Sequence, residues 1–250
     1  MVIDSHLHLP VDPSEFPAKK QALLDEMSRN GFDRGIVIAD SETESVIGSV
    51  RDCAELFKGD VVIKVIAGVS PLISFEEQLR YCRELLESGD IIGLKVYTGH
   101  EHFYCTDSSL FPVYDLAAEF GVPVLFHTGW DNNKYAAPER MRELAVKRRE
   151  NIFVYCHCFY PETEHCFEVL GECGNVFFDT SSVADDAEKC AKIKASIEKA
   201  INAMPKRFIF GSDFGSCSQE VHLRFAESLH ITKEQRELFM HGNAEYVYRL

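Results

Sequence analysis

The stretch IIGLKVYTGHEHFYCTDSSLFPVYDLAAEFGVPVLFHTG (residues 91–129) places a helical pattern between two short apolar runs. The runs at 91–99 and 122–129 have the length and composition of buried strands. The segment 110–121 between them has the pattern of a helix and ends on Gly121, a residue common after the last helical turn. This order predicts a βαβ unit, in which the two strands are parallel.

The same order recurs along the chain of 250 residues. Six further strands are predicted, at 2–8, 34–40, 61–69, 151–159, 175–182 and 207–214. Helical patterns lie between them, including one that ends on Gly31 and one that opens with a capping box made by Ser74 and Glu77. Eight units over this length predict an α/β fold, a (β/α)8 TIM barrel that forms a single domain over residues 1–250. The alternative, an open doubly wound sheet, usually has a Gly-rich phosphate loop after its first strand, and here that strand ends in His-Leu-His-Leu-Pro.

The amino-acid composition argues against some classes of binding partner. A net charge of −14 argues against a nucleic-acid surface and against docking to anionic membranes. No apolar run approaches the roughly 20 residues that a membrane helix needs. The cysteine count of nine is odd, and Met1 leads directly into a predicted strand without a signal peptide, so we expect reduced thiols and a cytoplasmic protein.

Polar residues that can bind a metal lie at the ends of the predicted strands, which is where TIM barrels carry their catalytic groups. The first strand ends in His6 and His8, and the fifth ends in His127. The sixth carries His157, and the eighth carries Asp213. A fourth-strand lysine, Lys95, is expected in the barrel interior, either as a substrate contact or as a structural charge paired with Asp4 or Asp179.

The two-residue period of a strand predicts which of these side chains face inward. His6 and His8 share one face, so we expect Ile3, Ser5 and Leu7 to face the helices. In the sixth strand, an inward His157 is expected to place Cys156 and Cys158 in the helix layer as small buried residues. A Cys-His-Cys zinc site is the weaker alternative, because it lacks the Cys-x-x-Cys spacing of structural zinc sites.

Three imidazoles and one carboxylate at a barrel mouth suit a first-row divalent ion, with zinc the leading candidate and iron, manganese or cobalt as alternatives. Such an ion can lower the pKa of a bound water toward about 7 and so provide hydroxide at neutral pH.

The strand-end pattern resembles the amidohydrolase superfamily, and in finer detail its amidohydrolase family 2 branch, which also contains aminocarboxymuconate-semialdehyde decarboxylase. The matching stretches are residues 3–10, 91–129, 175–182, 208–215 and 242–250. The resemblance implies that His6, His8, His127 and Asp213 bind the metal. It also implies that His157 polarises the substrate or contacts the ion, and that Asp213 accepts a proton from water.

Two positions test this resemblance. Lys95 lies where two-metal members carry a carboxylated lysine, which leaves a second ion open, although one ion is commoner in this branch. The sixth strand reads His157-Cys158-Phe159, whereas the branch usually has glycine at the third of these positions.

The leading hypothesis is a metal-dependent hydrolase in which activated water attacks the carbonyl carbon of a small amide, lactone or ester. The alternative is a non-oxidative decarboxylase of a small carboxylic acid, and a non-catalytic metal-binding barrel is the third reading. Lys95, Tyr97 and Trp130 are predicted to contact the substrate. Ser181 and Ser182 are expected either to hydrogen-bond it or to close the seventh strand. A homodimer is compatible with the sequence.

Overall fold

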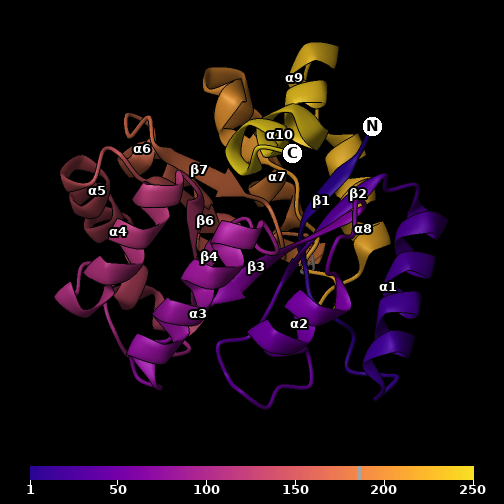
Figure 1. Cartoon of the computed structure of the whole chain (residues 1–250). Helices are drawn as coiled ribbons and strands as arrows, with labels where there is room; N and C mark the ends of the chain where they lie inside the picture. The colour runs from indigo at the N-terminus through magenta and orange to yellow at the C-terminus, as the bar shows by residue number, and fades with distance from the viewer. Residues whose placement is uncertain (185–186) are drawn as a thin grey trace.

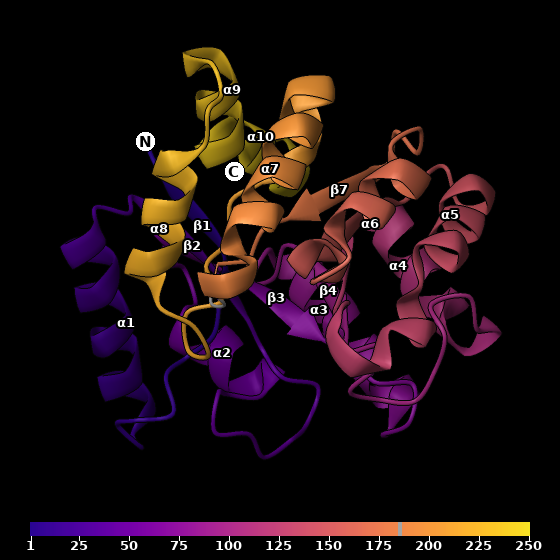
Figure 2. The ribbon, with the colours of Figure 1, turned by 180° about the vertical axis from the view of Figure 1, so that it is seen from behind.

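The computed structural model describes residues 1–184 and 187–250, without the side chains of residues 131–133 and 187–189. Eight parallel strands pair in chain order and are surrounded by helices, which confirms the predicted TIM barrel (Figures 1 and 2). The strands are β1 (Ile3–Leu7), β2 (Arg34–Ile38), β3 (Ile63–Gly68), β4 (Leu94–Val96), β5 (Pro123–Phe126), β6 (Ile152–Cys156), β7 (Val176–Asp179) and β8 (Phe208–Ile209).

The α-helices are α1 (Phe16–Asn30), α2 (Val50–Leu56), α3 (Phe75–Ser88), α4 (Phe111–Phe120), α5 (Pro138–Lys147), α6 (Thr163–Leu170), α7 (Ala187–Ala203), α8 (Gln219–Ser228), α9 (Lys233–Glu237) and α10 (Asn243–Tyr248). Short helical turns are η1 (Ser108–Leu110), η2 (Trp130–Ala136), η3 (His157–Phe159), η4 (Pro205–Arg207) and the π-helical η5 (Leu238–Gly242). None of the helices in the described residues is long and apolar enough to cross a bilayer.

Two of the predicted helix ends can be checked. Gly31 ends α1 with φ 75°, as expected of a glycine after the last turn. The predicted capping box at Ser74 is wrong, because Ser74 adopts φ 37° and its side chain makes no capping hydrogen bond. A left-handed backbone turns the hydroxyl away from the first helical N–H groups, which a capping residue must approach from extended backbone.

Backbone hydrogen bonds after β8 close the barrel onto β1. The N–H of Ser5 donates to the carbonyl of Phe210 at 3.1 Å, and the N–H of His8 donates to the carbonyl of Phe214 at 2.7 Å. Between them, the N–H of Asp213 donates to the carbonyl of His6 at 2.9 Å. The first and last strand-end motifs are therefore neighbours.

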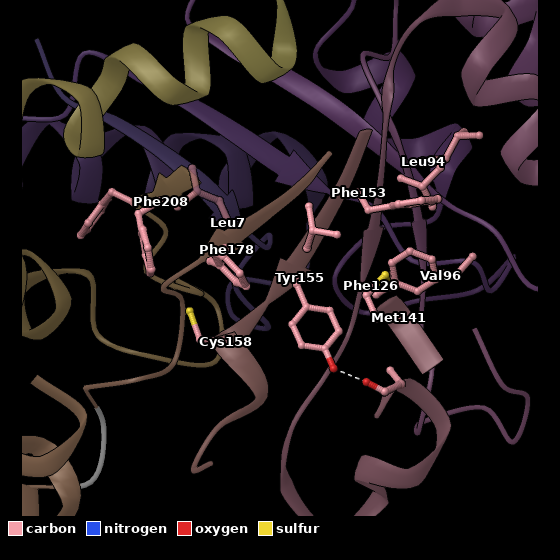
Figure 3. Packing of buried hydrophobic residues seen from close by; sticks show 14 of the residues in the cluster. Leu7, Leu94, Val96, Phe126, Met141, Phe153, Tyr155, Cys158, Phe178 and Phe208 are labelled. Carbon is pink, nitrogen blue, oxygen red and sulfur yellow. Dashed lines mark hydrogen bonds between the residues drawn. The ribbon is translucent and has the colours of Figure 1, made fainter. Parts of the chain in front are cut away.

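The larger part of the core lies between the strands and the helices. Phe126, Phe153, Phe178 and Phe208 pack there, and the Tyr155 hydroxyl donates to the carbonyl of Ala136 (Figure 3). This layer absorbs most of the apolar area that folding removes from water.

A second cluster fills the barrel interior with one or two residues from almost every strand. Its members are fully or almost fully buried and include Ile3, Ile36, Ile38, Ile66, Leu125, Val154, Cys156, Phe177 and Ile209. Ala244, Val247 and Tyr248 of α10 pack against the same cluster, and α10 lies on the side of the barrel where the chain begins (Figure 1). Helix α10 therefore closes the N-terminal end of the barrel and leaves the opposite end for the site.

Two predictions of side-chain direction in β1 are wrong and one is confirmed. Ile3 belongs to the interior cluster, and Ser5 contacts Tyr248 inside the barrel, whereas Leu7 packs against the helices as expected. The register with β2 shifts between Asp4 and Leu7, where β1 has one extra residue. Such a bulge interrupts the alternation, so Ser5 and His6 both face inward.

The interior cluster supports a stability prediction. Leu125→Ala removes a fully buried side chain from a ring of strand residues that cannot collapse into the space. We expect a loss of about 2–5 kcal/mol in the free energy of unfolding, measured by urea denaturation. Leu72→Ala is the control, because Leu72 is 66% exposed and should change the value by about 0.5 kcal/mol or less. Equal effects of the two substitutions would contradict this account of the core.

Candidate metal centre

A pocket of about 750 Å³ lies at the C-terminal end of the barrel. All eight residues predicted for the site border it: His6, His8, Lys95, Tyr97, His127, Trp130, His157 and Asp213. Residues from other strand-end loops complete the wall: Asp40, Ser41, Glu42, Ile47, His100, Glu101, Gly129, Ser182, Ser216 and Cys217. The positions of these residues at the ends of the predicted strands therefore indicated correctly that they lie around one pocket.

His6, His8 and Asp213 form a compact group of donors in this pocket. Their ligand atoms all lie within 4.8 Å of one another. Oδ1 of Asp213 is 3.5 Å from Nε2 of His6 and 3.3 Å from Nε2 of His8. Two atoms bound to one tetrahedral zinc ion at about 2.0–2.1 Å lie about 3.3–3.4 Å apart. The spacing fits ligands of a shared ion.

The other ring nitrogen of each histidine is held by an acceptor. Nδ1 of His6 lies 2.5 Å from Oδ2 of Asp179, and Nδ1 of His8 lies 3.0 Å from the carbonyl oxygen of Ile38. In the neutral form of each ring, these contacts place the proton on Nδ1 and direct the Nε2 lone pair at Asp213. Two lone pairs facing a carboxylate oxygen repel one another unless a cation lies between them, so the donor chemistry fits a divalent ion.

Burial favours the neutral form of three imidazoles of the site, those of His6, His127 and His157. It lowers the pKa of His6 despite the opposing charges of Asp179 and Asp213, and it lowers the pKa of His157 to about 3. Burial, the neighbouring His157 and Lys95 hold the pKa of His127 well below its usual value. Neutral imidazole is the form that binds metals, so these shifts favour the ligand state at neutral pH.

The carboxyl group of Asp213 is ionised in this environment. Burial opposes its charge, but the nearby imidazoles of His6, His8 and His157 outweigh burial and hold its pKa well below the usual range. Ionised Asp213 accepts hydrogen bonds or binds a cation, and it donates no proton.

His127 and His157 form a pair beside the compact group. Nδ1 of His127 and Nε2 of His157 lie 3.2 Å apart. Trp130 stacks on His127 at a ring-centroid distance of 5.6 Å and meets His157 edge-on at 5.1 Å. The ligand role of His127, the role of His157 and the substrate role of Trp130 stay predictions, and the packing shows that Trp130 also braces both imidazoles.

The predicted direction of Cys158 is confirmed, and that of Cys156 is wrong. Cys158 packs in the helix layer, whereas Cys156 faces the barrel interior. Strand β6 ends at Cys156, and His157, Cys158 and Phe159 follow with φ values of 62°, 50° and 60°. This left-handed turn ends the two-residue alternation, so Cys156 and His157 both reach the interior. Phe159 holds the left-handed backbone at the position where glycine is usual in the branch.

Lys95 meets Cys156 in the interior. Its side chain is 1% exposed, and Nζ lies 3.1 Å from Sγ of Cys156. Within the described residues it forms no salt bridge with Asp4 or Asp179. Asp4 instead accepts hydrogen bonds from Ser212 and Gln219, so the pairing expected as one alternative for Lys95 is wrong.

Sequence reasoning missed the role of Asp179 beside His6. Asp179 is fully buried, and its pKa is lowered because His6 outweighs the effect of burial. Gly211 makes the approach possible, since a Cβ there would lie 2.5 Å from Oδ1 of Asp179 and 2.8 Å from Cβ of His6. The alternation of Phe177 and Asp179 along β7 agrees with the interior position expected of Asp179 as a possible partner of Lys95, but it gives no signal for the contact with His6.

His6, Cys156 and Asp179 also have donor atoms within 4.8 Å of one another. The 2.5 Å between His6 and Asp179 is the length of a shared proton and is too short for two ligands of one ion. We read this set as hydrogen-bonded support beneath the first group.

The amidohydrolase family model matches residues 3–250. The protein belongs to amidohydrolase family 2. No curated protein matches the chain.

Solved structures of similar fold cover almost the whole of this amidohydrolase. An uncharacterised TIM-barrel protein from Bordetella bronchiseptica is 19% identical, with a TM-score of 0.79 and coverage of 98% of this chain and 97% of that one. A zinc-bound amidohydrolase from Burkholderia multivorans is 16% identical, with a TM-score of 0.77 and coverage of 100% and 99%. The 5-carboxyvanillate decarboxylase of Sphingomonas paucimobilis is 14% identical, with a TM-score of 0.70 and coverage of 100% and 99%. Other matches include a 4-oxalomesaconate hydratase and a manganese-bound dihydroxybenzoic acid decarboxylase.

The donor geometry predicts the effect of removing one imidazole. His8→Ala deletes one of the two Nε2 atoms that face Asp213, so the affinity for Zn²⁺ or Mn²⁺ should fall by more than the about 10–100-fold typical of outer-shell changes. Isothermal titration of the metal-stripped protein measures this. His165→Ala, at an exposed histidine paired with Glu139, should leave the affinity unchanged. Undiminished affinity in His8→Ala would remove His8 from the site.

Asp179→Asn tests the support of His6. Oδ1 of Asp179 accepts the N–H of Ser181 at 2.9 Å, so the amide oxygen should stay there and the amide nitrogen should face His6. Nδ1 of His6 must then accept, which moves the proton to Nε2 and blocks the ligand position. We expect metal affinity to fall by about 10–100-fold without loss of fold. Asp107→Asn, in a loop outside the pocket wall, is the control; an unaltered affinity in Asp179→Asn would contradict the tautomer assignment.

Proposed function

We propose that this amidohydrolase is a metal-dependent hydrolase of a small neutral amide, lactone or ester. The observation that carries the proposal is the arrangement of His6, His8 and Asp213, whose donor atoms are spaced as ligands of one ion at the mouth of a TIM barrel. His127 is the fourth proposed ligand, and one Zn²⁺ ion is the proposed occupant. A divalent ion held there would supply Lewis acidity, which acidifies water and polarises a carbonyl oxygen.

Asp213 is the proposed proton acceptor. It borders the pocket, is ionised, and lies where a water beside the histidines would be within reach. Asp213 takes the proton of the attacking water and returns it to the leaving nitrogen or oxygen, so the proton is conserved over the reaction.

His157 is the proposed donor to the substrate carbonyl. Its Nδ1 lies 2.8 Å from the Ser181 hydroxyl and 3.2 Å from the Ser181 carbonyl. The shorter contact favours the hydroxyl as donor to Nδ1, which leaves the proton of the neutral ring on Nε2. That N–H points toward His127 in the pocket and can be redirected to the oxygen on which negative charge develops.

The charges of the pocket wall favour a neutral substrate. Asp40, Glu42, Glu101 and Asp213 border the pocket, whereas Lys95 is the single lysine or arginine among the described wall residues. Lys95 lies deep and contacts Cys156, so away from the proposed ion a substrate carboxylate would meet mostly like charge.

Decarboxylation is the second candidate, because several proteins of similar fold bear that name. Metal analysis followed by a substrate panel separates the two. A lactone, a phenyl ester and an anilide test hydrolysis, and a hydroxylated benzoic acid tests release of carbon dioxide. Hydrolysis without carbon dioxide release supports the first proposal, and carbon dioxide release without hydrolysis would replace it with the second. No disulfide joins any of the nine cysteines in the described part of the chain, which is compatible with the reducing cytoplasm that we propose as the location of the protein.

Asp213→Asn tests the proton acceptor. The amide keeps one oxygen for the ion but cannot accept the water's proton, so the hydrolysis rate should fall by about 10²–10⁴-fold while some metal is retained. Turnover and metal content are measured on the same preparation. Asp115→Asn, at an exposed carboxylate paired with Arg148, is the matched control and should behave as the unchanged protein. An active Asp213→Asn enzyme would exclude Asp213 as the base.

A further inference from the structure

Ser182 contacts the half of Asp213 that the histidines leave free. Its hydroxyl donates to Oδ2 of Asp213, while Oδ1 of the same carboxylate lies near Nε2 of His6 and His8. Ser182 is 4% exposed and borders the pocket. The two oxygens of Asp213 therefore have different partners.

The protons around Ser182 fix the direction of this hydrogen bond. A hydroxyl has one proton, and an ionised carboxylate can only accept, so the proton of Ser182 belongs to Asp213. Sγ of Cys217 lies 3.2 Å from the same hydroxyl oxygen, and the thiol must donate there. The Cys217 thiol therefore donates to the Ser182 hydroxyl, and that hydroxyl donates to Asp213, so each proton has an acceptor.

The backbone holds the two residues face to face. Ser182 has φ 59° and Asp213 has φ 65°, in the left-handed region where non-glycine residues are strained. The preceding turn is tied to the site as well, because the N–H of Ser181 donates to Asp179 and its hydroxyl contacts His6 and His157. The end of β7 supplies none of the proposed ligands, yet it touches residues from β1, β6 and β8.

We propose that Ser182 is a positioning residue that keeps Asp213 a ligand through one oxygen, an inference that rests on the proposed metal centre. While Oδ2 is bound to the hydroxyl, it cannot turn toward the ion. Without the hydroxyl, Oδ2 loses its partner in a buried place, and binding to the ion through both oxygens becomes the nearest way to satisfy it. Ser182 thereby sets the number of ligands and keeps a position open for water.

The test uses the full chain loaded with Co²⁺, whose visible absorption depends on the number and geometry of its ligands. Ser182→Ala should weaken and reshape the visible bands as the ligand number rises, and should slow the release of Co²⁺ to excess chelator by about 10–100-fold. Ser182→Gly lacks the hydroxyl but relaxes the left-handed backbone, so it should fold and give the same change.

Thr180→Val is the matched control. Thr180 is a buried neighbour in the same segment, lies outside the pocket wall, and its hydroxyl makes a 3.4 Å contact with the carbonyl of Ile209. Its spectrum and release rate should match those of the unchanged protein. The inference is overturned if Ser182→Ala and Ser182→Gly keep the original spectrum, or if Thr180→Val changes it equally. If the protein binds no Co²⁺, both the proposed hydrolase function and the role of Ser182 are overturned. If the Ser182 variants change the Co²⁺ spectrum as expected but the protein hydrolyses none of the substrates, only the proposed function is overturned.

Discussion

The backbone hydrogen bond from Asp213 to the carbonyl of His6 joins the two ends of the sheet, and the site depends on it. A barrel closes only if its last strand pairs with its first, and here the paired residues are themselves two of the proposed ligands. The same pairing places His8 against Phe214, so both histidines and the carboxylate are set by main-chain geometry. Donor positions fixed in this way lose little conformational entropy when an ion binds.

Closure also brings buried polar groups together, and each must be satisfied. Asp4 accepts from Ser212 and Gln219 on the helix side of β1, while Asp179 accepts from His6 and Ser181 on the inner side. The bulge in β1 makes this division possible, because it lets Asp4 face outward while His6 faces inward. A regular strand would have placed Asp4 and His6 on one face, with two carboxylates and an imidazole competing for the same space.

Most of the fold and the positions of the site residues could be predicted from the sequence, because strand and helix periods and strand-end positions are local properties. What failed depended on backbone departures that no period encodes. The predicted side-chain direction of Ile3 is wrong because of the bulge in β1, and that of Cys156 is wrong because of the left-handed turn at His157. The support given by Asp179 and Ser182 required knowledge of neighbouring strands, which the spacing along one strand does not contain.

Strain in this barrel is concentrated where the chemistry is proposed. Of the non-glycine residues with positive φ, Trp130, His157, Ser182 and Asp213 border the pocket, and Cys158 and Phe159 complete the turn after His157. The opposite end is closed by α10 against aliphatic side chains of the interior cluster. The well-packed N-terminal half of the barrel can offset the energetic cost of the strained backbone in the C-terminal half, because every strand of the closed barrel belongs to both halves. The fold therefore separates stability from function along the barrel axis, and the strained turns can hold polar side chains in directions that regular strands would not give them.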